Sequence, residues 1–171
     1  MKRRLMAAAV TLILLAGGLL AGQRKADPPM RLTEEQAADL AISEMLAAWQ
    51  IGDVETLRGY HADDLTVVSG GFEPPIVGWA NYAQAYTRQR QRVIQPRIER
   101  RNTLMHVKGT MAWASYQWEF GALVEGKPSV ARGHTTLVLE KRRDRWIVLH
   151  NHTSVISDTG PEQPATQPPP K

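Results

Sequence analysis

Trp146-Ile147-Val148-Leu149-His150-Asn151-His152-Thr153-Ser154 forms a strand-like stretch near the C-terminus of this 171-residue chain. Side chains alternate between the two faces of a strand, so one face is expected to carry Trp146, Val148, His150, His152 and Ser154. A plain core strand would carry aliphatic residues at these positions. Polar and aromatic groups in a row are instead typical of a pocket floor. The stretch therefore predicts a pocket into which His150 and His152 point.

The segments before this stretch have the same period of two. Strands are predicted at residues 97–107, 111–123, 131–141 and 145–156. Short turn sequences such as Lys108-Gly109 and Arg142-Arg143-Asp144 separate them. Hairpin connections of this length predict an antiparallel sheet.

Helical patterns occupy the part of the chain before the strands. A capping-box pattern at residues 33–36 predicts the start of a long amphipathic helix that Gly52 ends. Asp53 is expected to cap a second, short helix, and a third is predicted from Trp79 to Arg92, with a short strand at 65–69 between them. Helices followed by a meander favour an α+β domain in which a curved sheet wraps around the helices.

The two ends of the chain differ in composition from its middle. Residues 1–29 combine a basic head with an apolar run, which predicts a signal peptide, or a single membrane anchor if it is not cleaved. Residues 30–157 are expected to form the domain. Residues 158–171 are rich in proline and polar residues and predict a disordered tail. The chain is therefore expected to be exported, either to a periplasm or outside the cell.

Charge and cysteine content restrict the partners. The net charge is +4, but three of the basic residues lie in the signal, and without them 18 bases face 17 acids. The domain is thus nearly neutral, so its basic isoelectric point does not indicate a nucleic-acid partner. The chain has no cysteine, which excludes disulfides and thiolate chemistry.

Several motifs together resemble the NTF2-like superfamily, specifically its SnoaL-like and DUF4440 branch. They are Trp49-Gln50-Ile51-Gly52-Asp53, Tyr60, Asp63-Asp64, Gly78, Arg132-Gly133-His134 and the stretch from Trp146 to Ser154. The closing Trp-x-x-x-His-x-His-x-Ser is also similar to the association domain of calcium/calmodulin-dependent kinase II. The resemblance implies a cone-shaped α+β fold around a deep pocket, and a homodimer built sheet to sheet.

This superfamily includes steroid isomerases, cyclases, dehydratases and binding modules, so the resemblance alone does not assign a function. The positions of the isomerase's catalytic groups can be carried over one by one. The general base falls at Ser69, the oxyanion-hole tyrosine at Met45, and the second acid among residues 135–137. None of these side chains can perform the corresponding role, so steroid isomerisation is not expected.

The last two strands suggest how the pocket is built. If Val138 lies opposite Val148, then Thr136 faces His150, His134 faces His152, and Arg132 faces Ser154. Three clustered imidazoles would suit zinc, but hydrogen bonding or acid/base work is the favoured role. No metal and no cofactor is therefore expected. Arg132 is a candidate partner for a carboxylate ligand.

Aromatic side chains complete the predicted site. Tyr116 and Trp118 are expected to form pocket wall, and Tyr82 and Tyr86 lie on the third helix, which is predicted to act as a lid. Trp113 lies on the opposite face and is a candidate for the dimer surface. Asp63-Asp64 is interpreted as structural, ending the second helix, and the arginines between residues 88 and 101 as a solvated face.

Two hypotheses of different class follow. The first is an exported module that binds a small, largely apolar ligand and forms a homodimer. The second is a cyclase- or dehydratase-type enzyme that uses His150 or His152 as its acid/base group. The first is favoured, because no carboxylate is clearly placed beside the histidines. No nucleic-acid partner is expected, and membrane contact only through an uncleaved N-terminal segment.

Overall fold

The computed structural model describes residues 31–69 and 72–159, and from Leu32 onward these belong to one compact unit. The segment predicted to be a signal, residues 1–29, lies outside the described residues, as does the predicted tail from residue 160. Within the described ranges no helix is long and apolar enough to cross a membrane.

Three helices form as their end signals predict. Helix α1 (Glu34–Ile51) begins at the Thr33 capping box and ends at Gly52, whose φ of 85° is left-handed. Helix α2 (Val54–Arg58) is capped by the Asp53 carboxylate, which accepts a hydrogen bond from the Thr56 amide. Helix α3 (Trp79–Arg90) stops two residues before its predicted end.

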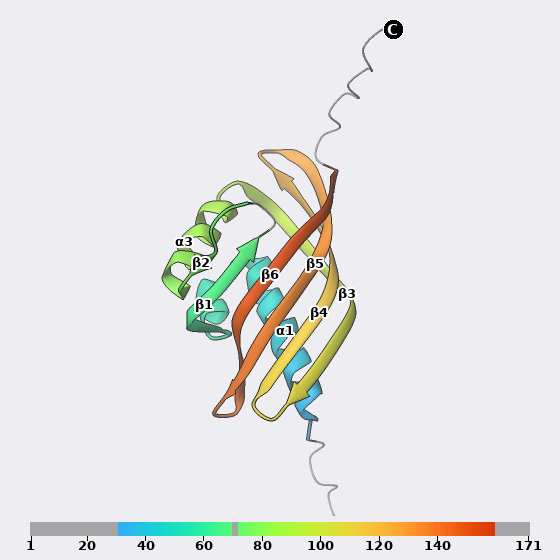
Figure 1. Ribbon diagram of the computed structural model, residues 1–171. Helices are drawn as coiled ribbons and strands as arrows, with labels where there is room; N and C mark the ends of the chain where they lie inside the picture. The colour runs from blue at the N-terminus through green and yellow to red at the C-terminus, as the bar shows by residue number, and fades with distance from the viewer. Residues whose placement is uncertain (1–30, 70–71, 160–171) are drawn as a thin grey trace, which may run out of the picture. The chain divides into compact units, whose positions relative to one another are not determined.

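The sheet has six strands in the order β2-β1-β6-β5-β4-β3 (Figure 1). They are β1 (His61–Ser69), β2 (Ile76–Val77), β3 (Val93–Lys108), β4 (Met111–Val124), β5 (Lys127–Arg142) and β6 (Arg145–Thr159). Strands β3 to β6 are joined as hairpins and are antiparallel, as predicted. Strand β1 pairs with β6 in parallel, so the sheet as a whole is mixed.

The curved sheet has an inner and an outer face. Helix α1 crosses the inner face and buries Ala38, Ile42, Met45 and Ala48 against it, while α3 lies beside the β1 edge (Figure 1). Strand β4 alternates strictly: Ala112, Ala114, Tyr116 and Trp118 are buried, whereas Met111, Trp113 and Gln117 are exposed. The predicted α+β class and curved architecture are therefore confirmed.

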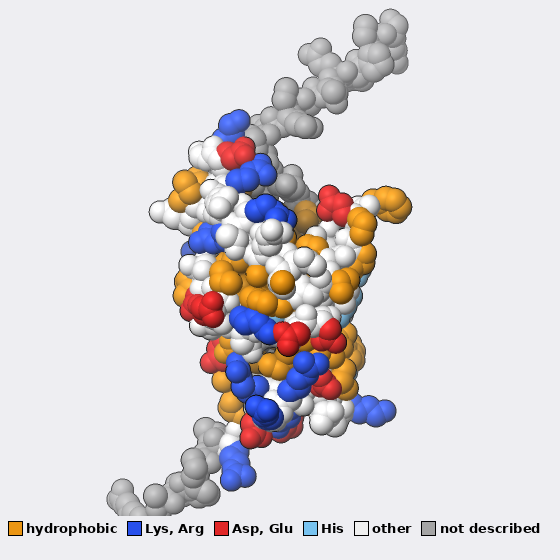
Figure 2. Space-filling view, turned by 90° about the vertical axis from the view of Figure 1, so that its left-hand side faces the viewer, with side chains coloured by type: hydrophobic (Ala, Val, Ile, Leu, Met, Phe, Trp, Pro, Cys, Tyr) orange, Lys and Arg blue, Asp and Glu red, His pale blue; other side chains and the backbone are white. Residues whose placement is uncertain are grey.

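The predicted start of β1 is wrong in an informative way. Strand β1 begins at His61, four residues before the predicted start, so Asp63 and Asp64 lie in the strand and do not end a helix. Both side chains are exposed, and they form ion pairs with Arg58 and Arg142, respectively. Figure 2 shows the side of the molecule on which α3 lies, where acidic and basic side chains are interspersed below a hydrophobic area.

Candidate functional site

A cavity of about 1190 Å³ lies between the helices and the inner face of the sheet. Its deep wall is mainly apolar and aromatic, with Met45, Leu46, Trp49, Leu57, Val67, Tyr82, Ile98, Tyr116, Trp118 and Phe120. Charged side chains on its lining are Glu73, Arg88 and Arg92, all of them exposed. A cavity of this size and lining is typical of a small-molecule site.

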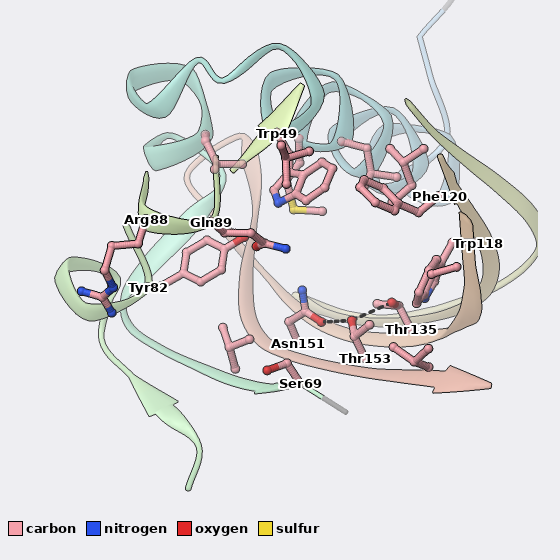
Figure 3. Close-up of a pocket in the computed structure, with 18 of the residues that line it drawn as sticks. Trp49, Ser69, Tyr82, Arg88, Gln89, Trp118, Phe120, Thr135, Asn151 and Thr153 are labelled. Carbon is pink, nitrogen blue, oxygen red and sulfur yellow. Dashed lines mark hydrogen bonds between the residues drawn. The ribbon is translucent and has the colours of Figure 1, made fainter. Parts of the chain in front are cut away.

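One polar strip crosses the apolar wall (Figure 3). The hydroxyls of Thr135 and Thr153 lie 2.7 Å apart, and the Thr153 hydroxyl donates to Oδ1 of Asn151 over 2.9 Å. Because Thr153 uses its single proton on Asn151, Thr135 is the donor between the two threonines. Asn151 Oδ1 accepts this hydrogen bond, and its Nδ2 points into the cavity, where no described residue accepts a hydrogen bond from it.

A bulge in β6 determines which residues face this cavity. Val148 lies opposite Leu139, but His150 lies opposite Val138, so Leu149 is an extra residue in β6. An extra residue exchanges the two faces of the strand from that point on. Before the bulge Trp146 and Val148 are buried, and after it Asn151 and Thr153 line the cavity.

The predicted inward orientation of His150 and His152 is therefore wrong. Both rings lie on the outer face, where His152 is exposed and neither residue lines the cavity. The predicted register is also wrong by two residues, because His134 lies opposite Ser154 and Thr136 opposite His152. Arg132, expected to face Ser154, lies opposite Ser157.

The other predicted site residues divide into two groups. Tyr82, Tyr116 and Trp118 line the cavity as expected. Trp146 is buried in the core, and the Tyr86 hydroxyl donates to the Trp49 carbonyl over 2.6 Å. Arg132, His134 and Ser154 do not line the cavity, and the Arg132 guanidinium lies 3.5 Å from the Glu119 carboxylate on the outer face. A carboxylate ligand inside the cavity thus has no partner in Arg132.

The clustered zinc site considered for His134, His150 and His152 does not form. Within residues 31–69 and 72–159, no group of three or more His, Cys, Asp or Glu side chains is arranged to hold a metal ion. The register shift at Leu149 explains this, because it moves His152 opposite Thr136 and away from His134.

His61 is a cavity residue that the sequence pattern did not single out. It is 3% exposed and opens β1, with two residues between it and the end of the short helix α2. Its Nδ1 lies 2.8 Å from the Leu57 carbonyl, and its ring lies 5.2 Å from that of Tyr82. Burial lowers the pKa of His61 to about 4, so the ring is neutral at physiological pH. A histidine three positions after the end of a capped one-turn helix was the available signal.

The cavity phenols are donors that do not ionise near neutral pH. Burial raises the pKa of Tyr116 to about 12, and burial also raises the pKa of Tyr82. Tyr82 and Gln89 both extend from α3 into the cavity (Figure 3). The wall thus offers neutral hydrogen-bonding groups among aromatic rings.

Gly133 on β5 allows Trp118 to lie against the sheet. A Cβ at this position would lie 2.0 Å from the Ser154 carbonyl oxygen and 2.4 Å from the Trp118 ring, so any side chain would displace one of them. The Trp118 indole N–H is buried and has no acceptor among the described residues. Gly133 therefore fixes one wall of the cavity through close backbone contact.

The arginines between residues 88 and 101 are mostly paired. Arg92 forms an ion pair with Glu125, Arg97 and Arg101 with Glu99, and Arg100 with Asp39. Arg90 donates to the Val93 carbonyl. Local acids thus neutralise most of this basic concentration.

Three positions tested for isomerase chemistry also lie on the cavity lining. Ser69 and Met45 stand where the resemblance implies the base and the oxyanion-hole tyrosine, and Thr135 is one of the three positions for the second acid. None of the three has an ionisable side chain. The cavity therefore lacks the isomerase groups at those positions.

Comparisons with known proteins agree with this architecture. The model of the SnoaL-like domain matches residues 39–158. No curated protein matches the chain. A ketosteroid isomerase-like protein from Erwinia carotovora atroseptica is 20% identical with a TM-score of 0.64, covering 74% of this chain and 99% of that one.

Two further solved structures are similar. A proposed scytalone dehydratase from Novosphingobium aromaticivorans is 12% identical with a TM-score of 0.68, covering 74% of this chain and 86% of that one. A proposed calcium/calmodulin-dependent protein kinase II association domain from Xanthomonas campestris is 16% identical with a TM-score of 0.64, covering 73% and 89%. At these identities the likeness shows the fold alone.

Proposed function

The chain belongs to the SnoaL-like domain family of the NTF2-like superfamily, and on that premise we propose that its cavity binds a small, largely apolar molecule carrying a hydrogen-bond acceptor. The observation that carries this proposal is the polar strip, which ends in the Asn151 Nδ2 donor, a group that is hydrogen-bonded to none of the described residues. An apolar cavity with few fixed polar groups orients a ligand by those groups.

Binding is favoured over acid/base catalysis by what surrounds the histidines. His150 and His152 do not line the cavity, so the enzyme hypothesis loses the groups on which it depended. His61 does line it, but its Nδ1 is held by a backbone carbonyl. Among the described residues, no carboxylate forms a hydrogen bond or ion pair with it. A ring with a pKa of about 4 is also a weak base.

Nile red is a suitable probe, because it is neutral, polycyclic and fluorescent in apolar surroundings, and it carries a carbonyl acceptor. We expect saturable binding at one site per chain. Asn151→Leu should raise the dissociation constant about tenfold, because the probe's carbonyl loses its donor.

His152→Leu is the matched control, because His152 is the next residue of β6 and points to the outer face of the sheet. It should leave the dissociation constant unchanged. Ala131→Phe narrows the cavity and should also weaken binding. Equal effects of Asn151→Leu and His152→Leu would refute the proposed site.

We also propose a homodimer formed through the outer face of the sheet. Trp113 and Leu104 are 44% and 61% exposed there, and the Trp113 ring stacks on His106 at 4.4 Å. Exposed large apolar side chains on a sheet face favour association.

Export is proposed on the basis of residues 1–29, whose basic head and apolar run are typical of a signal peptide. Expression of the full chain followed by N-terminal sequencing of the product would test it. Loss of the N-terminal segment is expected, whereas a full-length product in the cytoplasmic fraction would contradict export.

A further inference from the structure

His61 is a second polar group on the cavity wall, separate from the strip that ends in Asn151. Its ring is almost completely buried, yet it lines the cavity. Its ring clusters with those of Trp79 and Tyr82, whose centres lie 5.3 and 5.2 Å from it and 5.8 Å from each other. Because the lining is mainly apolar, a ligand that covers this polar ring without forming a hydrogen bond to it would lose binding free energy.

The hydrogen bond to Leu57 fixes which nitrogen carries the proton. A backbone carbonyl only accepts, so Nδ1 must be the protonated nitrogen that donates to it over 2.8 Å. Nε2 then carries a lone pair. Among the residues that the structure describes, none donates a hydrogen bond to Nε2.

The charges around the ring keep it neutral. Arg58 donates to the His61 backbone carbonyl over 2.9 Å, and its guanidinium lies 5.5 Å from the Trp79 ring centre. The Asp63 carboxylate pairs with Arg58 and is itself exposed. Burial and the charge on Arg58 both lower the pKa of His61. Burial keeps the neighbouring Tyr82 un-ionised, and among the described residues no carboxylate is hydrogen-bonded or ion-paired to the His61 ring to stabilise an imidazolium.

From this geometry we infer that Nε2 of His61 accepts a hydrogen bond from the ligand, so that the cavity selects neutral aromatic molecules that carry a hydroxyl or N–H group. The inference rests on the proposed binding function and adds the donor requirement to it. Aromatic rings on the wall, from Trp49, Tyr82, Tyr116, Trp118 and Phe120, provide the surface for the ligand's body.

The same geometry disfavours two related classes of ligand. An ether of the same shape would leave Nε2 unpaired beside apolar atoms, which costs affinity. A carboxylate would place its charge against a lone pair in an apolar cavity and is disfavoured more strongly. Specificity therefore comes from the acceptor on His61 as well as from the shape of the cavity.

Three fluorescent probes of one shape test this inference: hydroxypyrene, its methyl ether methoxypyrene, and pyrene carboxylate. At neutral pH the wild type should bind hydroxypyrene about tenfold more tightly than methoxypyrene, and pyrene carboxylate most weakly. His61→Phe should abolish the preference without weakening methoxypyrene binding. His152→Phe, the same change on the outer face, should retain the preference.

Two further measurements keep the test independent of the folding of one variant. His61→Gln retains an acceptor and should preserve part of the preference. In the wild type, the Nε2 resonance of ¹⁵N-labelled His61 should shift on adding hydroxypyrene but not methoxypyrene, an effect that a purely structural role would not produce.

The outcomes separate the inference from the function on which it rests. If methoxypyrene binds in the cavity as tightly as hydroxypyrene, the donor requirement is wrong and the proposed binding function stands. If none of the three probes binds, nor Nile red, then both fail. An equal loss of preference in His152→Phe would also overturn the role of His61.

Discussion

His61 makes stability depend on pH because the folded state keeps its ring neutral. Burial lowers its pKa to about 4, whereas in the unfolded chain it has the ordinary value of 6.5. Between these values the unfolded state binds more protons, so stability is complete above pH 6.5 and is lost as pH falls toward 4. The free energy of unfolding should drop by about 2 kcal/mol between pH 7 and pH 5 through this residue alone.

Urea unfolding of the wild type and of His61→Gln at both pH values measures this contribution. The variant should lack the drop, because it has no group that titrates there, while the exposed carboxylates contribute equally to both proteins. If the free energies of unfolding of the two proteins depend on pH in the same way, the pKa of His61 is not lowered in the folded state.

At the level of single residues, the sequence predicted correctly which aromatic side chains line the cavity, but not which polar side chains do. Tyr82, Tyr116 and Trp118 lie on the cavity wall as their alternation and helical spacing predicted. Asn151 was missed because Leu149 is an extra residue in β6. After this bulge, the residues expected on the outer face point into the cavity, and the histidines point outward. Strict alternation cannot detect a bulge that carries neither glycine nor proline.

Among the strands, the contact between β5 and β4 at Gly133 should be sensitive to one methyl group. Gly133→Ala forces its Cβ against Trp118 and the Ser154 carbonyl, which should cost about 1–3 kcal/mol of unfolding free energy and move the Trp118 ring. Urea unfolding and near-ultraviolet circular dichroism measure the two effects.

Gly121→Ala on β4 is the matched control, because a Cβ there meets nothing within 4 Å. Its unfolding free energy should stay within about 0.5 kcal/mol of the wild type. If the two substitutions cost the same, the close contact at Gly133 does not fix the cavity wall.

Element types were predictable, but the pairing of distant elements was not. Thr33, Gly52 and Asp53 gave the ends of α1 and α2, and short turns gave the hairpins from β3 to β6. The parallel pairing of β1 with β6 joins segments about eighty residues apart in the chain. No local turn signal encodes such a pairing, so the sheet was expected to be antiparallel throughout.

For the whole molecule, the proposed homodimer depends on the outer face of the sheet. Trp113→Glu places a charge on that face and should raise the dimer dissociation constant at least about tenfold. Trp113 is 44% exposed, so the substitution should leave the fold intact. Sedimentation equilibrium measures the association.

Leu40→Glu is the control, because Leu40 is similarly exposed at 45% but lies on α1. It should leave association unchanged. A wild type that remains monomeric at high concentration, or a dimer insensitive to Trp113→Glu, would contradict this interface.

For the whole molecule, the central question is which side of β6 meets the ligand. Isotope-edited nuclear Overhauser spectroscopy of the Nile red complex measures this directly, because it detects protons within about 5 Å of the probe. We predict contacts from the Asn151 amide and the Thr135 and Thr153 methyl groups, and none from the rings of His150 and His152. Contacts from those two rings, without any from Asn151, would contradict the account.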